Sequence, residues 1–182
     1  AEIIGLPEKI TDITVAIDKL DKIGIAGVNK ELQEKGINQQ AIDELQKFIN
    51  FSVVPLDDNH LPAFKLFFEG KSEIGLKGYE ELCFIKDNLK SLNIKHIVLE
   101  LDITLARGLN YYTGTIFEAK ANAGTFTPSI LGGGRYDDLT GIFGLNGMSG
   151  VGISFGADRM YDVLEEAGLF PADATLSTKV LI

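Results

Sequence analysis

The stretch Gly150-Val-Gly-Ile-Ser-Phe-Gly-Ala-Asp-Arg159 combines two patterns that decide how this part of the chain folds. Its small residues recur at alternate positions, as in a strand with one face open to close approach by a ligand or a second backbone. Apolar residues from Met160 to Leu164 then follow at helical spacing. We therefore expect a strand that leads into a helix over 158–167 and delivers Arg159 to the first turn of that helix.

Strand patterns dominate the sequence from about His96 onward. The run Ile97-Val-Leu99 is short and apolar, residues 112–119 alternate, and residues 124–134 hold the turn and glycine material of an antiparallel return strand. Within that material, Gly132-Gly-Gly134 is interpreted as a loop that needs unusual backbone freedom. It is not a P-loop, because no Lys-Ser/Thr pair follows the glycines.

Apolar residues at helical spacing fill the first half of the chain. One stripe runs from Ile10 to Ile23, with Pro7 near its start and Gly24 at its end, which are typical start and stop signals. With Asn38 as a capping residue, the pattern predicts helices over about 10–23, 28–35, 39–49 and 79–92 and a loop over 55–62. Helices and antiparallel strands in separate blocks imply an α+β fold rather than a doubly wound parallel sheet.

Composition restricts the class of protein. The 182 residues are 45% hydrophobic and 24% charged, which is typical of a soluble globular protein and excludes a disordered one. No apolar run reaches the ~18 residues that span a bilayer, and the N-terminus lacks a secretory signal, so we expect a cytoplasmic protein without membrane contact. A net charge of −9 argues against broad binding of nucleic acids, because phosphate contacts need concentrated Lys and Arg.

Cysteine and histidine are scarce. Cys83 is the single cysteine, which excludes an internal disulfide, and with His60 and His96 as the only histidines a Cys/His zinc site is not credible. We expect Cys83 to be a buried helix residue. The missing initiator methionine and the strand-like ending Ser177-Thr-Lys-Val-Leu-Ile182 favour a segment of a longer protein.

Arginine is distributed differently from lysine. All three arginines stand near glycines in the strand-rich half, whereas twelve of the fourteen lysines precede residue 96. A guanidinium is a planar fork of donors that fits phosphate or carboxylate, so these three segments are predicted to recognise anions. Structural roles remain open for each, with Arg107 as a surface residue beside half-buried tyrosines, Arg135 in a surface Arg–Asp pair at a turn, and Arg159 paired with Asp158 or Asp162.

In order and spacing, the three arginine segments resemble the histidyl-tRNA synthetases, a family of class II aminoacyl-tRNA synthetases. Two of them, Arg107-Gly-Leu-Asn-Tyr-Tyr-Thr-Gly114 and Gly132-Gly-Gly-Arg-Tyr-Asp137, are close to the two histidine-specific signatures of that family. The third, Gly150-Val-Gly152 followed by Asp158-Arg159, matches the end of the third class II motif. The helical half, notably Ala16-Ile-Asp-Lys-Leu-Asp-Lys-Ile-Gly24, resembles the family's insertion domain and the segment that leads into it.

The resemblance implies a division of the chain and a set of site residues. Residues 1–95 would form the helical segment and insertion domain, and residues 96–182 the C-terminal part of the catalytic core with its antiparallel sheet. Arg107 would be the catalytic arginine, in contact with the α-phosphate of ATP and the carboxylate of histidine. The histidine pocket would contain Arg107, Tyr111, Tyr112, Gly133 and Tyr136, and the ATP site Arg107, Gly156 and Arg159, the last at the γ-phosphate. Glu118 would lie near this site, and no residue is assigned to a metal.

The resemblance also implies a reaction and its partners. The parent protein would activate L-histidine with ATP to histidyl-adenylate and transfer the histidyl group to tRNA(His), as a homodimer and with Mg²⁺ whose ligands are not assigned. Asn110 stands where the commonest family form has Asp, which removes a charge from the first signature. Nothing in the chain resembles the first two class II motifs or the anticodon-binding domain, so the isolated chain is expected to be inactive.

Two other interpretations remain open. A synthetase-like regulatory subunit of ATP phosphoribosyltransferase, which serves histidine biosynthesis, would keep this fold without catalysis. Such a protein has no need to stabilise phosphoryl charge, so the presence of both Arg107 and Arg159 favours the enzyme. A helical module joined to an unrelated sheet domain would leave the three arginine motifs without a role.

Overall fold

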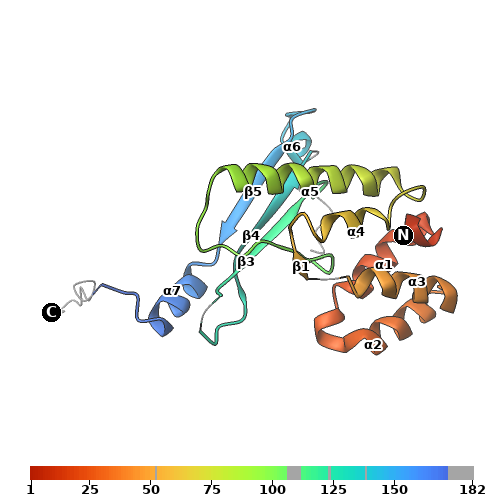
Figure 1. Ribbon diagram of the computed structural model, residues 1–182, viewed down its shortest axis with the longest axis horizontal. Helices are drawn as coiled ribbons and strands as arrows, with labels where there is room; N and C mark the ends of the chain where they lie inside the picture. Colours follow the sequence, from red (N-terminus) through yellow and green to blue (C-terminus); the bar gives the residue numbers. More distant parts are fainter. Residues whose placement is uncertain (52, 106–111, 123, 138, 172–182) are drawn as a thin grey trace. The chain divides into compact units, whose positions relative to one another are not determined.

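A computed structural model describes residues 1–51, 53–105, 112–122, 124–137 and 139–171 of the chain (Figure 1). Two short 3₁₀-helices, Glu2–Ile4 and Pro7–Lys9, come first. The other elements are α1 (Ile10–Ile17), α2 (Leu20–Glu34), α3 (Gln39–Ile49), β1 (Val54–Pro55), α4 (Leu61–Lys65), α5 (Glu73–Ser91), β2 (Glu100–Leu101), β3 (Ile116–Lys120), β4 (Ser129–Tyr136), α6 (Leu139–Ile142), β5 (Gly150–Phe155) and α7 (Ala157–Glu166).

The elements fall into two compact units, Ala1–Asn110 and Tyr111–Ile182. The first unit is mainly helical, and the second is built on the sheet β3-β4-β5. Every strand pairing in the described part of the chain is antiparallel. The predicted α+β fold is therefore confirmed. None of the described helices combines the length and the apolar character that a membrane crossing requires.

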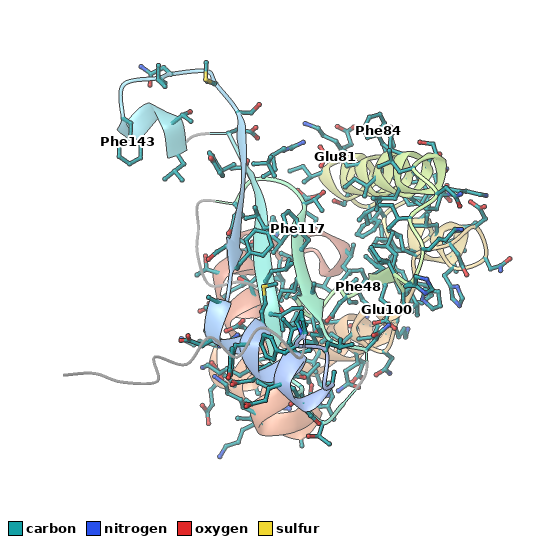
Figure 2. All side chains as sticks on the ribbon, turned by 90° about the vertical axis from the view of Figure 1, so that its left-hand side faces the viewer. Phe48, Glu81, Phe84, Glu100, Phe117 and Phe143 are labelled. Atoms are coloured by element: carbon teal, nitrogen blue, oxygen red, sulfur yellow. The ribbon has the colours of Figure 1, made fainter. Side chains whose placement is uncertain are left out.

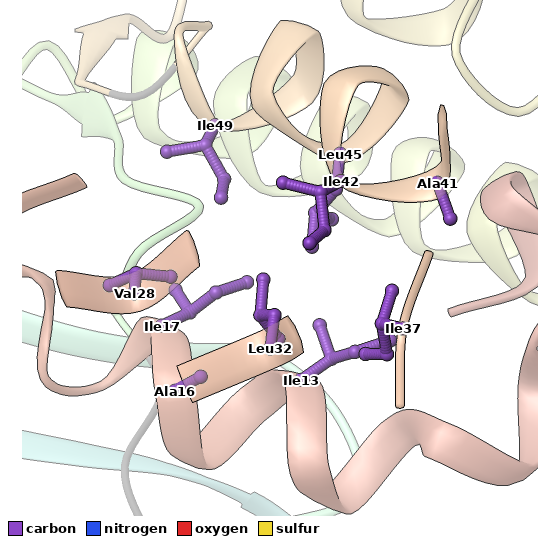
Figure 3. Close-up of a cluster of buried hydrophobic side chains, with 10 residues drawn as sticks. All are labelled: Ile13, Ala16, Ile17, Val28, Leu32, Ile37, Ala41, Ile42, Leu45 and Ile49. Atoms are coloured by element: carbon purple, nitrogen blue, oxygen red, sulfur yellow. The ribbon is translucent and has the colours of Figure 1, made fainter. Parts of the chain in front are cut away.

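Three helices of the first unit converge on one buried apolar cluster (Figure 3). Helices α1, α2 and α3 and the turn before α3 contribute Ile13, Ala16, Ile17, Val28, Leu32, Ile37, Ala41, Ile42, Leu45 and Ile49. The third helix begins where it was predicted, because the side chain of Asn38 accepts a hydrogen bond from the Ala41 amide at 2.9 Å and so caps α3. Burial of this cluster stabilises the three-helix arrangement, since apolar surface is removed from water.

The predicted single helix between Ile10 and Ile23 is wrong. Helix α1 ends at Ile17, α2 starts at Leu20, and Gly24 interrupts α2 with a φ of 65°. Glycine adopts this left-handed conformation without steric cost, so the chain bends there and the helix then resumes instead of ending. The apolar spacing is compatible with one helix, but α1 and α2 pack against each other and each turns one side toward the shared cluster, which one continuous helix cannot do.

A second buried cluster includes two residues, Leu56 and Leu61, of the segment predicted to be a loop. Its buried members are Leu56, Leu61, Phe64 and Leu101. Strand β1 pairs with β2, and α4 starts with Pro62 in its first turn, a helix-start signal that the loop prediction overlooks. The expected strand Ile97-Val-Leu99 is also wrong, because only the Leu99 carbonyl joins the pairing, as the acceptor for the Leu56 amide at 3.0 Å.

Helix α5 is longer than predicted and begins at Glu73 rather than Tyr79. Its start is set by Ser72, whose hydroxyl oxygen accepts a hydrogen bond from the Gly75 amide at 2.8 Å. Cys83 lies in this helix as predicted, but it is half-buried at the margin of the second cluster rather than fully buried. Phe84, the next residue, is exposed on the helix surface (Figure 2).

The packing of α1 can be tested by truncating two neighbouring side chains. Ile13→Ala is expected to lower the free energy of unfolding by about 2–5 kcal/mol, because the side chain is 1% exposed and its loss leaves a cavity. Val15→Ala should change it by about 0.5 kcal/mol or less, since Val15 is 45% exposed. Urea unfolding followed by helical circular dichroism measures both, and equal effects would contradict this burial pattern.

Candidate functional site

Strand pairing in the second unit sorts the side chains of the sheet onto two faces. Residues directly opposite each other in antiparallel strands share a face. One face, called here the glycine face, carries Ile116, Glu118, Gly132, Gly134, Tyr136, Gly150, Gly152 and Ser154. The other, called the apolar face, carries Phe117, Ala119, Leu131, Gly133, Arg135, Val151, Ile153 and Phe155.

Two tyrosine rings lie on the glycine face. A Cβ atom added at Gly134 would stand 2.7 Å from Cδ1 of Tyr112, and one added at Gly150 would stand 2.5 Å from Cε2 of Tyr136. A Cβ atom at Gly152 would also meet the Tyr136 ring, at 3.4 Å. Because Gly134 and Gly152 are paired, the two rings occupy neighbouring positions on this face. Both tyrosine rings thus pack directly against the backbone of glycine residues.

Residues 132–134 lie within β4 rather than in the predicted loop. None of the three has a positive φ, so backbone freedom is not the reason for glycine here. The reason is space, because a Cβ atom at Gly133 would stand 2.0 Å from the carbonyl oxygen of Gly152 and 2.8 Å from Cζ of Phe117. Gly133 and Phe117, a β3 residue labelled in Figure 2, belong to the apolar face. Any contact of Gly133 with a ligand on the glycine face would therefore go through its backbone.

Arg135 joins the two segments that carry the tyrosines. Its Nη2 atom lies 3.8 Å from Oδ2 of Asp137, and the same oxygen accepts a hydrogen bond from the Thr113 hydroxyl at 2.7 Å. The Arg135 carbonyl also accepts a bond from the Thr113 amide at 3.0 Å. A Cβ atom at Gly114 would stand 2.4 Å from Nε of Arg135, so the guanidinium passes directly over this glycine. The Arg–Asp pair considered from the sequence is present, at the end of a strand instead of in a turn.

Arg159 lies in the first turn of α7, directly after β5 and Gly156, which confirms the predicted strand-to-helix connection. Its Nη1 donates a hydrogen bond to the Ser129 carbonyl at 2.7 Å. No carboxylate of the described residues lies within ion-pair distance of Arg159, which excludes the alternative pairing with Asp158 or Asp162. The guanidinium is therefore held by a neutral acceptor at the first residue of β4.

The opposite end of α7 is also tied to the sheet. Oε1 of Glu166 accepts hydrogen bonds from the amide of Thr125 at 2.6 Å and from its hydroxyl at 2.8 Å. These bonds, with a further one from the Phe126 amide, lower the pKa of the Glu166 carboxyl, because they favour its charged form. No sequence pattern predicts this contact. The sequence indicates only that Glu166 lies two helical turns after Arg159 and therefore on the same side of the helix.

The structure describes only some of the remaining predicted site residues. Glu118 is half-buried on the glycine face, opposite Gly132. Arg107, Asn110 and Tyr111 lie outside the described residues, and their roles stay predictions. No group of three or more His, Cys, Asp or Glu side chains in the described part is arranged to hold a metal ion. Mg²⁺ is commonly bound through substrate phosphates and waters with one or two carboxylates, and it has no assigned ligand in this chain.

The chain is similar in sequence to one family over most of its length. Residues 5–160 match the family model described as histidyl-tRNA synthetase. The chain belongs to the histidyl-tRNA synthetase family. A histidine–tRNA ligase from Christiangramia forsetii is 55% identical to it over 100% of this chain and 39% of the ligase. The chain thus spans about two fifths of the length of that relative.

Solved structures agree with this family. A crystal structure of histidyl-tRNA synthetase from Nostoc has a TM-score of 0.76 and 35% identity, covering 91% of this chain and 38% of the synthetase. A Bacillus halodurans protein, titled as an ATP phosphoribosyltransferase regulatory subunit/histidyl-tRNA synthetase, has a TM-score of 0.70 but only 17% identity, over 90% of this chain and 41% of its own. The second likeness shows a shared fold alone.

The close packing of the family's glycine segment predicts an asymmetric response to alanine. Gly133→Ala is expected to lower the free energy of unfolding by about 1–3 kcal/mol, because the added methyl group overlaps the Gly152 carbonyl. The matched control is Gly78→Ala in α5, where a Cβ meets nothing within 4 Å and helix propensity should raise stability by about 0.5–1 kcal/mol. Urea unfolding measures both, and a stabilised Gly133→Ala variant would contradict the β4–β5 packing.

Proposed function

We propose that this chain is the part of a histidine–tRNA ligase that binds L-histidine and ATP. Residues 1–95 would form the helical segment and insertion domain, and residues 96–182 the C-terminal part of a class II catalytic core. The observation that carries the proposal concerns β4: two phenols lie on the glycine face toward its Tyr136 end, and Arg159 is bonded to Ser129 at its other end. At a rise of about 3.3 Å per residue, β4 spans roughly 23 Å between Ser129 and Tyr136, enough for an amino acid joined to a nucleotide.

The tyrosine end of the glycine face is proposed to bind histidine. Each phenol can donate or accept a hydrogen bond and can therefore pair with an imidazole nitrogen. A pocket built to make such bonds rejects side chains that lack them, because its polar groups would then be left unpaired. Tyr112 and Tyr136, whose rings lie on the glycine face, would make this contact, and Tyr111 would complete it, with backbone groups of Gly133 nearby.

The arginines are proposed to bind the nucleotide. In the activation step, a carboxylate oxygen of histidine attacks the α-phosphorus of ATP, a carbon–oxygen–phosphorus link forms, and the bond to pyrophosphate breaks. Negative charge accumulates on the phosphoryl oxygens, and the Arg107 guanidinium would stabilise it without proton transfer. Arg159 would exchange the Ser129 carbonyl for the γ-phosphate, since a charged acceptor makes the stronger hydrogen bond. Gly156 would leave room for this part of the nucleotide.

In the second step, a hydroxyl of the terminal ribose of tRNA(His) would attack the acyl carbon, and AMP would leave. We place this reaction in a cytoplasmic homodimer with Mg²⁺ on the nucleotide, as expected for class II synthetases. The family match and the named relatives support histidine and its tRNA as the substrates of the parent protein.

Substitution of Arg107 in the full-length parent tests the activation step. Arg107→Ala is expected to lower histidine-dependent ATP–pyrophosphate exchange by about 10²–10³-fold or more, as loss of a preorganised donor does elsewhere. Histidine binding, measured by calorimetry, should weaken far less. Arg107→Lys keeps the charge but not the planar fork and should recover only part of the rate.

Two results would contradict this assignment. Unchanged exchange in Arg107→Ala would remove Arg107 from the reaction. Tight histidine binding by the unaltered parent without any exchange or tRNA charging would favour the regulatory subunit of ATP phosphoribosyltransferase instead.

We further infer that the 182-residue chain alone does not make histidyl-adenylate. Val151, Ile153 and Phe155 on the apolar face are 70%, 52% and 58% exposed, whereas the apolar face of a sheet is normally packed against another layer. Phe143, directly after α6, is 78% exposed (Figure 2). Exchange should therefore be undetectable with the isolated chain and normal with the parent at equal concentration. Comparable rates from the two proteins would overturn this inference.

A further inference from the structure

Helix α7 is tied by side chains at both of its ends to one short stretch of the chain. At its start, Arg159 donates to the carbonyl of Ser129. At its end, Glu166 accepts from the amide and hydroxyl of Thr125. Ser129 is the first residue of β4, and Thr125 lies four residues before it, in the connection that leads into that strand. Because Arg159 and Glu166 are about two helical turns apart, the same side of α7 makes both contacts.

The two contacts are of different kinds. Arg159 is bound to a neutral carbonyl, and under the proposed function it gives up this partner when it takes a phosphate. The Glu166 carboxylate is bound to three donors on Thr125 and Phe126, and nothing in the proposed reaction replaces them. Both contacts include one charged group, but Glu166 accepts from three donors, whereas Arg159 donates to one residue. The contact at Glu166 therefore persists when the contact at Arg159 is exchanged.

The loop around Gly124 is shaped for the carboxylate. Gly124 has a φ of 84°, and a Cβ atom added to it would stand 3.1 Å from the carboxyl carbon of Glu166. The last turn of α7 holds acids and no base, which is unfavourable beside the negative end of a helix dipole. Glu166 therefore does not stand there to stabilise the helix end, and its role lies in the contact with the loop.

We propose that Glu166 is a positioning residue, which holds the far end of α7 against the Gly124–Phe126 loop and so fixes where Arg159 meets the nucleotide. The inference rests on the proposed function, because it assigns Arg159 to a phosphate. With one end of α7 fixed at Glu166, the helix keeps its direction when Arg159 leaves Ser129. Without that fixed end, the helix can tilt, and the guanidinium loses its preset orientation.

Steady-state exchange kinetics of the full-length parent test this role. Glu166→Ala is expected to raise the KM for ATP roughly three- to tenfold, within the range of coupling between interacting residues. The KM for histidine and the melting temperature should change little. Glu166→Gln keeps an acceptor oxygen, so its KM for ATP should lie between the values of the unaltered parent and of Glu166→Ala. Glu165→Gln, in the same helical turn, is the control and should leave all three quantities unchanged.

A double-mutant cycle separates positioning from general stabilisation. If Glu166 acts through Arg159, Glu166→Ala should have no further effect on the KM for ATP in an Arg159→Ala background. An equal effect in both backgrounds would overturn the inference. If Glu166→Ala does not fold, Thr125→Val removes only the hydroxyl donor and should raise the same KM by a smaller factor, and an unchanged KM would then overturn the inference.

The cycle also distinguishes this inference from the proposed function. An Arg159→Ala variant with an unchanged KM for ATP would overturn the proposed phosphate contact, and with it the role of Glu166. A large effect of Arg159→Ala together with none from Glu166→Ala would overturn the positioning role alone.

Discussion

The second unit depends on how closely β4 and β5 approach each other. The Gly152 carbonyl occupies the place that a side chain at Gly133 would need, and the rings of Tyr112 and Tyr136 occupy the corresponding places at Gly134 and Gly150. Each of these contacts exists only because the residue beneath has no Cβ atom. One steric condition therefore sets how closely the tyrosine rings approach the sheet and leaves room for the Gly152 carbonyl beside Gly133.

Polar contacts connect the segments that pack around this sheet. Asp137 joins Thr113 to Arg135 and so connects the two segments that carry the tyrosines. Arg159 and Glu166 connect the ends of α7 to the start of β4 and the loop before it. Of the two described arginines, Arg135 serves the scaffold through an acidic partner of its own, whereas Arg159 has a neutral partner. Under the proposed function, that difference in partner separates Arg135, which stays with Asp137, from Arg159, which takes the incoming phosphate.

Patterns of short range were sufficient to predict several elements. The cap at Asn38 and the connection from β5 through Gly156 into α7 depend on residues close together in the sequence, and both are confirmed. The α+β class followed from the change of periodicity, which is likewise local. The resemblance to the family rested on short motifs, and the family match bears it out.

The wrong and missing predictions concern features that depend on residues far apart in the sequence. Gly132-Gly-Gly134 suggested a loop because glycine permits unusual dihedral angles, but the need for glycine at Gly133 comes from Gly152 and Phe117, which lie on other strands. The division at Ile17 and the kink at Gly24 let α1 and α2 pack on each other in one cluster, which no periodicity in α1 can report. The contact between Glu166 and Thr125 joins residues far apart in sequence and has no motif.

The bare backbone under the two phenols limits how this surface can change. A substitution at Gly134 or Gly150 displaces a ring before it can offer a new group to a ligand. Beneath the rings the glycine face thus offers only peptide groups, which do not differ from one amino acid to the next. Under the proposed function, discrimination between ligands, and any change in it over evolution, would therefore come from the side chains above this backbone and along its margins.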